Sequence, residues 1–304
     1  MEKNYLKLLW EACVLFNRRS GAILSAASSF YVLLTIVPLF LLIIRAVGIF
    51  IGDIAQVQSQ TFSLVLAAFP SVLPGMIEKL QNIVSGPLFG SAKFTVINFV
   101  ILAWSSLSFF NSIWNGLYIM TDDHKHVSIW KHLKGIVVIG ITIGLVVFVI
   151  GVPPLVMAII NFIRTSETIE TLSKVIPGLS FLKSYILSFT IGKNFLLKSN
   201  IFSFFIFLGY FTVLYRWFFA WKLSWKESVT SSAVFVLLLY LGKNLFWVYL
   251  MYVRENLIKN YGDYYTFILG IIWIFLVMNF FFLGASLCHV FMVRNKLLQE
   301  KKDD

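Results

Sequence analysis

Charged residues are scarce in this chain. Only 13% of its 304 residues are Asp, Glu, Lys or Arg, whereas 59% are hydrophobic, and the mean hydropathy is +0.85. Soluble domains carry about 25% charged residues, so this composition excludes a soluble protein and indicates an integral membrane protein. The net charge of +11 does not indicate a nucleic-acid partner, because the basic residues fall mainly between apolar segments. Membrane topology and anionic lipid headgroups account for them there.

Motifs for catalysis and energy coupling are also missing. The sequence contains no GxxxxGK[ST], HExxH or GxSxG motif. We therefore expect no nucleotide-driven pump, no enzyme and no cofactor. All fourteen acidic residues lie outside the apolar segments, which disfavours an antiporter that works through an intramembrane carboxylate.

Metal-ligating residues are few. Cys13 and Cys288 lack the spacing of a zinc site, and we expect both to be structural thiols on the cytoplasmic side. The sequence DDHKH at 122–126 offers oxygen and nitrogen ligands, but nothing fixes their geometry, and a solvated loop explains it equally well. We expect no metal site.

A helix needs about 20 residues to cross a bilayer. The sequence contains six apolar segments of about this length or longer, and they predict an all-α polytopic membrane protein with six spans. The predicted spans cover about residues 29–51, 93–116, 135–162, 201–217, 228–253 and 264–292. Before them, residues 1–28 hold an amphipathic helix that we expect to lie in the membrane interface. Two outer segments, about 53–91 and 164–200, are broken by Pro or Gly and predict helical insertions.

An even number of spans places both termini on one side of the membrane. The segments predicted to lie inside carry more Lys and Arg than the longer segments predicted outside. The positive-inside rule then favours two cytoplasmic termini.

Polar side chains are concentrated on one side of the second predicted span. Ser108, Asn111 and Asn115 follow Trp104 at helical spacing. In lipid, such groups turn towards other helices and bond across them.

Two cations lie inside predicted spans that contain no acidic residue. Arg45 is about six residues from the outer end of its span and Lys243 about ten, which is ~9 and ~15 Å at the rise of an α-helix. Buried charge needs compensation from carbonyls, water or an anionic ligand. One hypothesis is a lipid-headgroup site formed by Lys243, Arg45, Asn244 and Asn111. The alternatives are a packing lysine that lines a wet crevice, and an arginine that reaches the interface.

Several stretches together resemble the YihY/BrkB family of six-helix bacterial inner-membrane proteins. They are AASSFYVLLTIVPLF at 26–40, WSSLSFFNSIWNGLY at 104–118, LYRWFFAWKLSWKESVTSSAVFVLLLYLGKNLFWVYL at 214–250 and YGDYYTFILGIIWIFLVMNFFFLGASL at 261–287. They cover about half the chain. Within or beside them we assign structural roles to Pro38, Trp104, Gly262, Trp273 and Gly284.

The resemblance implies an envelope role linked to export of lipids or lipopolysaccharide precursors. We therefore expect a protein that binds or moves an anionic phospholipid or lipid precursor without an ATPase of its own. The alternative is a structural protein that anchors an envelope assembly through a protein partner. A lipid-sized groove that reaches Lys243 would favour the first interpretation, and a solid bundle with a flat apolar side the second.

Overall fold

Helices make up all the regular structure that is described. The structure is a computed structural model, and it describes residues 5–51, 58–59, 62, 78, 81–82, 96–121, 135–145, 148, 200–219 and 223–303. Its elements are α1 (Tyr5–Arg18), α2 (Gly21–Ile51), α5 (Val96–Thr121), α10 (Asn200–Phe218), α11 (Trp225–Tyr261), the short 3-10 helix η2 (Gly262–Tyr264) and α12 (Tyr265–Asp303). An apolar helical segment, Gly135–Leu145, lies between α5 and α10 in the chain. The predicted all-α fold is confirmed.

Three of the described helical segments are long and apolar enough to cross a membrane. They are Gly21–Leu39, Trp225–Tyr261 and Tyr265–Leu297, and they confirm an integral membrane protein. The count of six spans stays a prediction, since most of the third predicted span lies outside the described residues. The two predicted outer insertions also lie almost wholly outside them.

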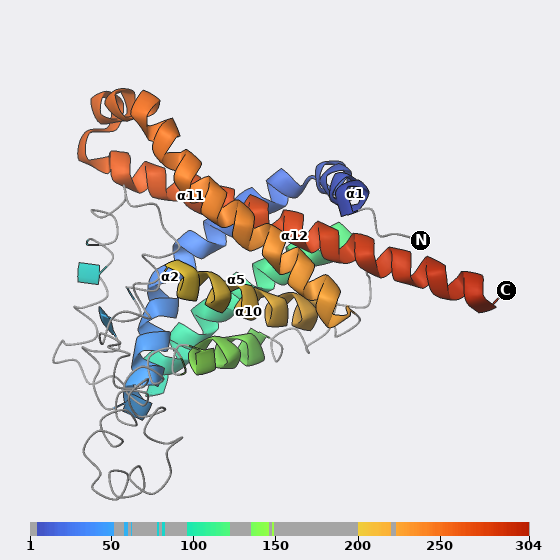
Figure 1. The fold of residues 1–304 in the computed structure, drawn as a ribbon. Coiled ribbons are helices and arrows are strands. Elements are labelled where there is room, and N and C mark those ends of the chain that lie inside the picture. The colour runs from blue at the N-terminus through green and yellow to red at the C-terminus, as the bar shows by residue number, and fades with distance from the viewer. Residues whose placement is uncertain are drawn as a thin grey trace, which may run out of the picture.

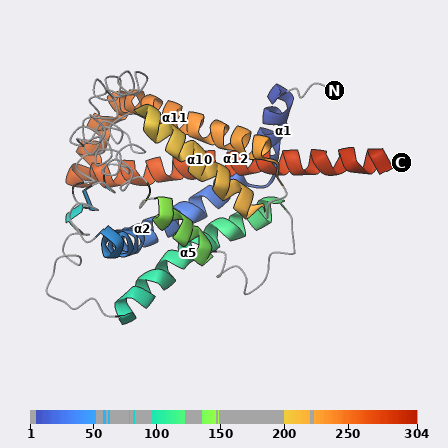
Figure 2. The same cartoon turned by 60° about the horizontal axis from the view of Figure 1, so that its bottom comes forward.

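The last helix, α12, is the centre of the arrangement. Helices α1, α2, α5 and α11 all pack against it, α2 also packs on α5, and α11 packs on α10 (Figures 1 and 2). The turn between α11 and α12 lies at the opposite end from α1 and the last turns of α12 (Figure 1). At 39 residues, α12 is ~58 Å long, about twice the thickness of the hydrocarbon core. Its C-terminal turns project beyond the other helices (Figure 2).

Helix α2 begins at Gly21, well before the start of the predicted span at residue 29. A turn separates it from α1, and Ser20 has a left-handed backbone with φ of 55°. The helix then runs through a serine-rich stretch, in which serine hydroxyls bond to carbonyls one turn earlier and are thereby satisfied within the helix. Ser25 donates to the Gly21 carbonyl at 2.8 Å, and Ser29 donates to the Ser25 carbonyl at 2.6 Å.

The start of α11 is fixed by a capping box. The backbone N–H of Glu227 donates to the Ser224 hydroxyl, and the carboxylate of Glu227 accepts from the Ser224 backbone N–H at 3.1 Å. This reciprocal pair satisfies two amide groups that a helix start leaves open. The side-chain amide of Asn295 also donates to both oxygens of Glu227, at 3.0 and 3.1 Å. The start of α11 is thereby tied to the late turns of α12.

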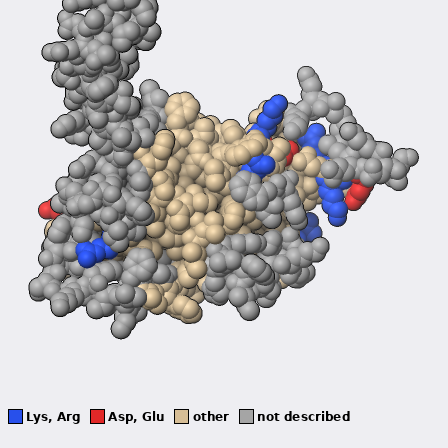
Figure 3. Space-filling model, turned by 90° about the horizontal axis from the view of Figure 1, so that it is seen from below, with Lys and Arg blue, Asp and Glu red and all other residues tan. Residues whose placement is uncertain are grey.

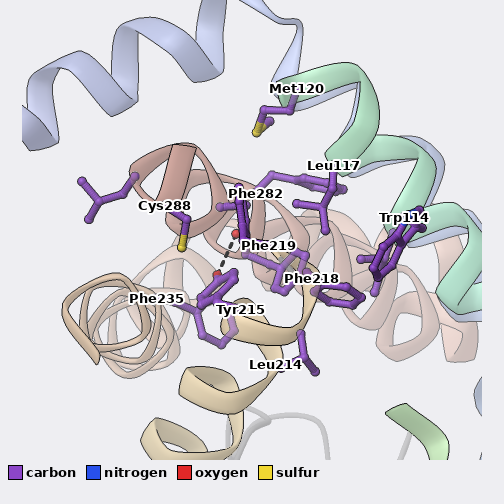
Figure 4. Close-up of a cluster of buried hydrophobic side chains, with 14 of the residues drawn as sticks. Trp114, Leu117, Met120, Leu214, Tyr215, Phe218, Phe219, Phe235, Phe282 and Cys288 are labelled. Carbon is purple, nitrogen blue, oxygen red and sulfur yellow. Dashed lines mark hydrogen bonds between the residues drawn. The ribbon is translucent and has the colours of Figure 1, made fainter. Parts of the chain in front are cut away.

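An aromatic core joins α5, α10 and α12 (Figure 4). The ring of Tyr215 in α10 stacks on Phe281 in α12 with centroids 5.3 Å apart, and its hydroxyl donates to the Phe281 carbonyl at 2.8 Å. Trp114 of α5 packs edge-on against Phe218 of α10 at 5.1 Å. Because lipid tails are as apolar as these rings, close packing and the interhelical hydrogen bond stabilise the bundle here.

Candidate functional site

Two helices, α2 and α5, enclose a groove with a polar lining. Its volume is about 340 Å³, and it is partly open to the surface. Its described lining residues are Leu24, Ala27, Ser28 and Tyr31 of α2, and Ser108, Asn111, Ser112, Asn115, Gly116 and Ile119 of α5. On both helices they recur at intervals of three and four residues, which places side chains on one helical face. A polar stripe on α5 therefore faces a mixed face of α2, to which Ser28 and Tyr31 contribute the polar groups.

A side-chain hydrogen bond crosses between the two helices beside this groove. The Ser112 hydroxyl donates to the Ser28 hydroxyl at 3.3 Å. Asn111 and Asn115 add amide donors and acceptors to the lining. The polar side of the second predicted span indicates that these groups face another helix. In the structure α5 turns them towards α2.

Gly116 connects the groove to the aromatic core. It lines the groove, and a Cβ atom at this position would lie 2.5 Å from the ring of Phe282 in α12. A side chain here would force the Phe282 ring, which is fully buried, to move. The groove therefore lies directly against packed core, and its α5 wall is held in place by α12.

The lining defines the chemistry available in the groove. Hydroxyl and amide groups donate and accept hydrogen bonds, and the described lining contains no Asp, Glu, Lys, Arg or His. Such groups suit the oxygen atoms of a phosphate, glycerol or sugar. The volume is at the lower end of the range for ligand pockets, about 300–1,000 Å³. The groove thus offers neutral hydrogen bonding to a polar ligand.

The predicted headgroup residues are not gathered in this groove. Lys243 lies at the midpoint of α11 and is partly buried, while Asn244 beside it is exposed. Arg45 is partly buried near the end of α2. Of these predicted residues, Asn111 alone is among the described residues that line the groove. The helices of Arg45 and Lys243 both pack on α12, and the joint headgroup site stays a prediction.

Gly284 of α12 lies against Tyr215 of α10. A Cβ atom at this position would be 2.4 Å from the Tyr215 hydroxyl oxygen, so only glycine leaves room for the hydrogen bond of that hydroxyl. Gly262 ends α11 with a positive φ of 53°, which glycine adopts without strain, and its N–H bonds to the Ile258 carbonyl. Both positions thus have a physical requirement for glycine.

The three other residues with assigned structural roles lie in different environments. Trp273 is 1% exposed and packs edge-on against Phe246 with centroids 5.3 Å apart. Pro38 lies inside α2, and Figure 1 shows that this helix changes direction along its length. Trp104 is 71% exposed on α5. The 122–126 cluster lies outside the described residues.

The α2 side of the groove was not identified from the sequence. Ser28 is buried against Ser112. The available signal was spacing, because Ser25, Ser28 and Ser29 fall on one face of α2, as Ser108 and Ser112 do on α5. Matching two such stripes would have paired these helices.

The long apolar helices, packed about α12 with a polar groove between two of them, define a polytopic α-helical membrane protein. The chain matches the family model described as virulence factor BrkB over residues 12–304. It belongs to the BrkB family, and this confirms the resemblance of its sequence stretches. No curated protein and no solved structure matches the chain.

Proposed function

We propose that this BrkB-family protein binds an anionic phospholipid or lipid precursor in the bacterial inner membrane and moves it, without enzymatic chemistry. The observation that carries this proposal is the polar groove between α2 and α5. Polar groups within membrane helices are costly, and they commonly line substrate pathways. The oxygen atoms of a headgroup can form further hydrogen bonds with the hydroxyl and amide groups of this lining.

The outer face of α2 offers a surface for the lipid tails. Phe30 and Leu34 are 59% and 58% exposed, and Tyr31, which lines the groove, is 41% exposed. The rings of Phe30 and Tyr31 contact edge-on at 5.9 Å. A headgroup in the groove would therefore have apolar surface beside it for an acyl chain.

The orientation that we propose places both termini in the cytoplasm. Helix α1 and the last turns of α12 lie at one end of the bundle. On the face shown in Figure 3, the visible described Lys and Arg side chains lie towards the two ends, with several at this end, and uncharged described residues lie between them. The positive-inside rule favours this end as the cytoplasmic one. The groove would then lie in the inner half of the membrane, since it is lined by the first turns of α2 and the last of α5.

Matched asparagine substitutions test the groove. Asn111→Leu removes an amide from the lining, whereas Asn244→Leu makes the same change at an exposed position outside it. A hydrogen bond to a charged group contributes about 1.5–3 kcal/mol, so Asn111→Leu should lower co-purified anionic lipid about tenfold or more. Native mass spectrometry of gently extracted protein measures this. Equal lipid content in both variants and the wild type would refute the groove, and loss in Asn244→Leu alone would favour the site around Lys243.

A structural role in an envelope assembly is the second candidate. Leu237, Leu241 and Leu245 recur every four residues along α11 and are all more than half exposed. Such a stripe suits the apolar face of a partner helix as well as lipid. Loss of an envelope phenotype in Leu241→Ser, with co-purified lipid unchanged, would favour this candidate.

A further inference from the structure

A second cavity lies at the other side of α12, between this helix and α1. Its volume is about 830 Å³, and it is partly open. Lys7, Glu11 and Arg18 line it from α1, and His289, Arg294 and Leu297 are among the residues that line it from α12. This α1–α12 cleft shares none of its described lining residues with the groove between α2 and α5.

The amphipathic pattern of α1 explains why the cleft forms. Leu8 and Ala12 are 3% and 1% exposed, and they hold α1 against α12. Lys7, Glu11 and Arg18 follow an adjacent face at helical spacing, with Val14 between them. The same helix therefore provides both the contact with α12 and one wall of the cleft.

The charges of the cleft favour an anion. Lys7, Arg18 and Arg294 bring three basic side chains to the lining, against the single carboxyl group of Glu11. Arginine in particular binds phosphate through paired N–H donors. The charged part of the cleft therefore complements a phosphate group.

The remaining lining is apolar. Val14, Val293 and Leu297 line the cleft and are exposed, and Trp10, which also lines it, is 70% exposed. Free phosphate gains nothing from such surface, whereas an acyl chain does. Tryptophan and basic residues together are also typical of helices at the membrane interface.

We propose that the α1–α12 cleft binds an anionic phospholipid, with its phosphate at Arg18 and Arg294 and the start of an acyl chain on Val14 and Leu297. The lipid comes from the leaflet on the side of α1. This site stands independently of the proposed role of the α2–α5 groove. It gives α1 a specific lipid contact in addition to its contact with α12.

Lipid titration of the full-length protein in detergent tests the site. Phosphatidylglycerol and phosphatidylcholine are added separately, and bound lipid is measured by native mass spectrometry. A basic residue near an anionic membrane contributes about fivefold in affinity. Arg18→Gln and Arg294→Gln should each weaken phosphatidylglycerol binding about fivefold, and should weaken phosphatidylcholine binding less, because its choline cation balances the phosphate charge. Arg254→Gln, the same change on an exposed residue of α11, should have no effect.

Three further measurements keep the proposal open to refutation. Arg294→Lys retains the charge and should retain most of the affinity. If a glutamine variant fails to fold, Lys7→Gln at an exposed position of α1 replaces it. In the Asn111→Leu background, which weakens the groove, the glutamine variants should still weaken phosphatidylglycerol binding about fivefold, so failure of the cleft and failure of the groove are separate results. Equal binding of both lipids, unchanged affinity in the glutamine variants, or complete competition by millimolar inorganic phosphate would each overturn the inference.

Discussion

The contact between Gly284 and Tyr215 makes the sharpest prediction for the stability of the bundle. In Gly284→Ala, the new methyl group would lie 2.4 Å from the Tyr215 hydroxyl oxygen and 3.0 Å from the ring carbon that bears it. Both residues are fully buried or nearly so, so the ring has little space to move. The hydroxyl would lose its 2.8 Å hydrogen bond to the Phe281 carbonyl.

The expected change in the free energy of unfolding comes from two costs and one gain. Overpacking of a dense core costs about 1–3 kcal/mol, and leaving a buried hydroxyl without a partner costs about 1–3 kcal/mol. Alanine gains about 1 kcal/mol over glycine in helix propensity. We therefore expect Gly284→Ala to destabilise the protein by about 1–5 kcal/mol. Gly209→Ala in α10 is the control, because no described atom lies within 4 Å of its new methyl group.

Thermal unfolding in detergent, followed by tryptophan fluorescence, measures these effects in a double-mutant cycle. Tyr215→Phe alone should cost about 0.5–1.5 kcal/mol, the value of one hydrogen bond. It also removes the oxygen atom nearest to the new methyl group, so Gly284→Ala should cost less in the Tyr215→Phe background than in the wild type. A melting temperature of Gly284→Ala equal to that of Gly209→Ala, or strictly additive effects, would refute the reasoning.

Three other results are expected. Cys13 is exposed and Cys288 is buried. An impermeant maleimide should therefore label Cys13 in inverted membranes but not in intact cells, and should label Cys288 only after denaturation. Labelling of Cys13 in intact cells would contradict a cytoplasmic N-terminus. Glu227→Ala removes the carboxylate of the capping box, which is worth about 1 kcal/mol. It should lower the melting temperature, whereas Glu255→Ala, at an exposed position of the same helix, should not. Lys243→Met removes a partly desolvated charge while keeping apolar length, so its melting temperature should equal or exceed that of the wild type; a large decrease would show that the ammonium group is needed for folding.

Hydropathy and helical spacing predict the helices well and their partners poorly. The all-α fold and the positions of α10, α11 and α12 follow directly from the apolar segments. The sequence also indicates that Leu8 and Ala12 lie on the apolar face of α1. It does not indicate that this face meets α12, because lipid and a neighbouring helix are equally apolar.

For the candidate site too, the sequence predicts residues on single helices but not which helices come together. The polar stripe of Asn111 on α5 is visible in the sequence, but the matching stripe of Ser28 is short and was not recognised as its partner. For Lys243 and Arg45, the sequence gives a depth along each helix. It gives no direction around the helix axis, and that direction decides which side chains share a cavity.

The central place of α12 has a consequence for biosynthesis. Helix α12 ends at residue 303, so the ribosome makes it after every other described helix, yet α1 and α2 pack against it. About 250 residues separate the end of α2 from the end of α12, which takes ~10–50 s to translate. During this time the first helices lack their native neighbour. The antiparallel pair α11–α12 is contiguous and can form as soon as both helices are inserted. Closure of the bundle is therefore a late event, and a chain that stops before α12 would leave α1 and α2 without the helix that holds them together.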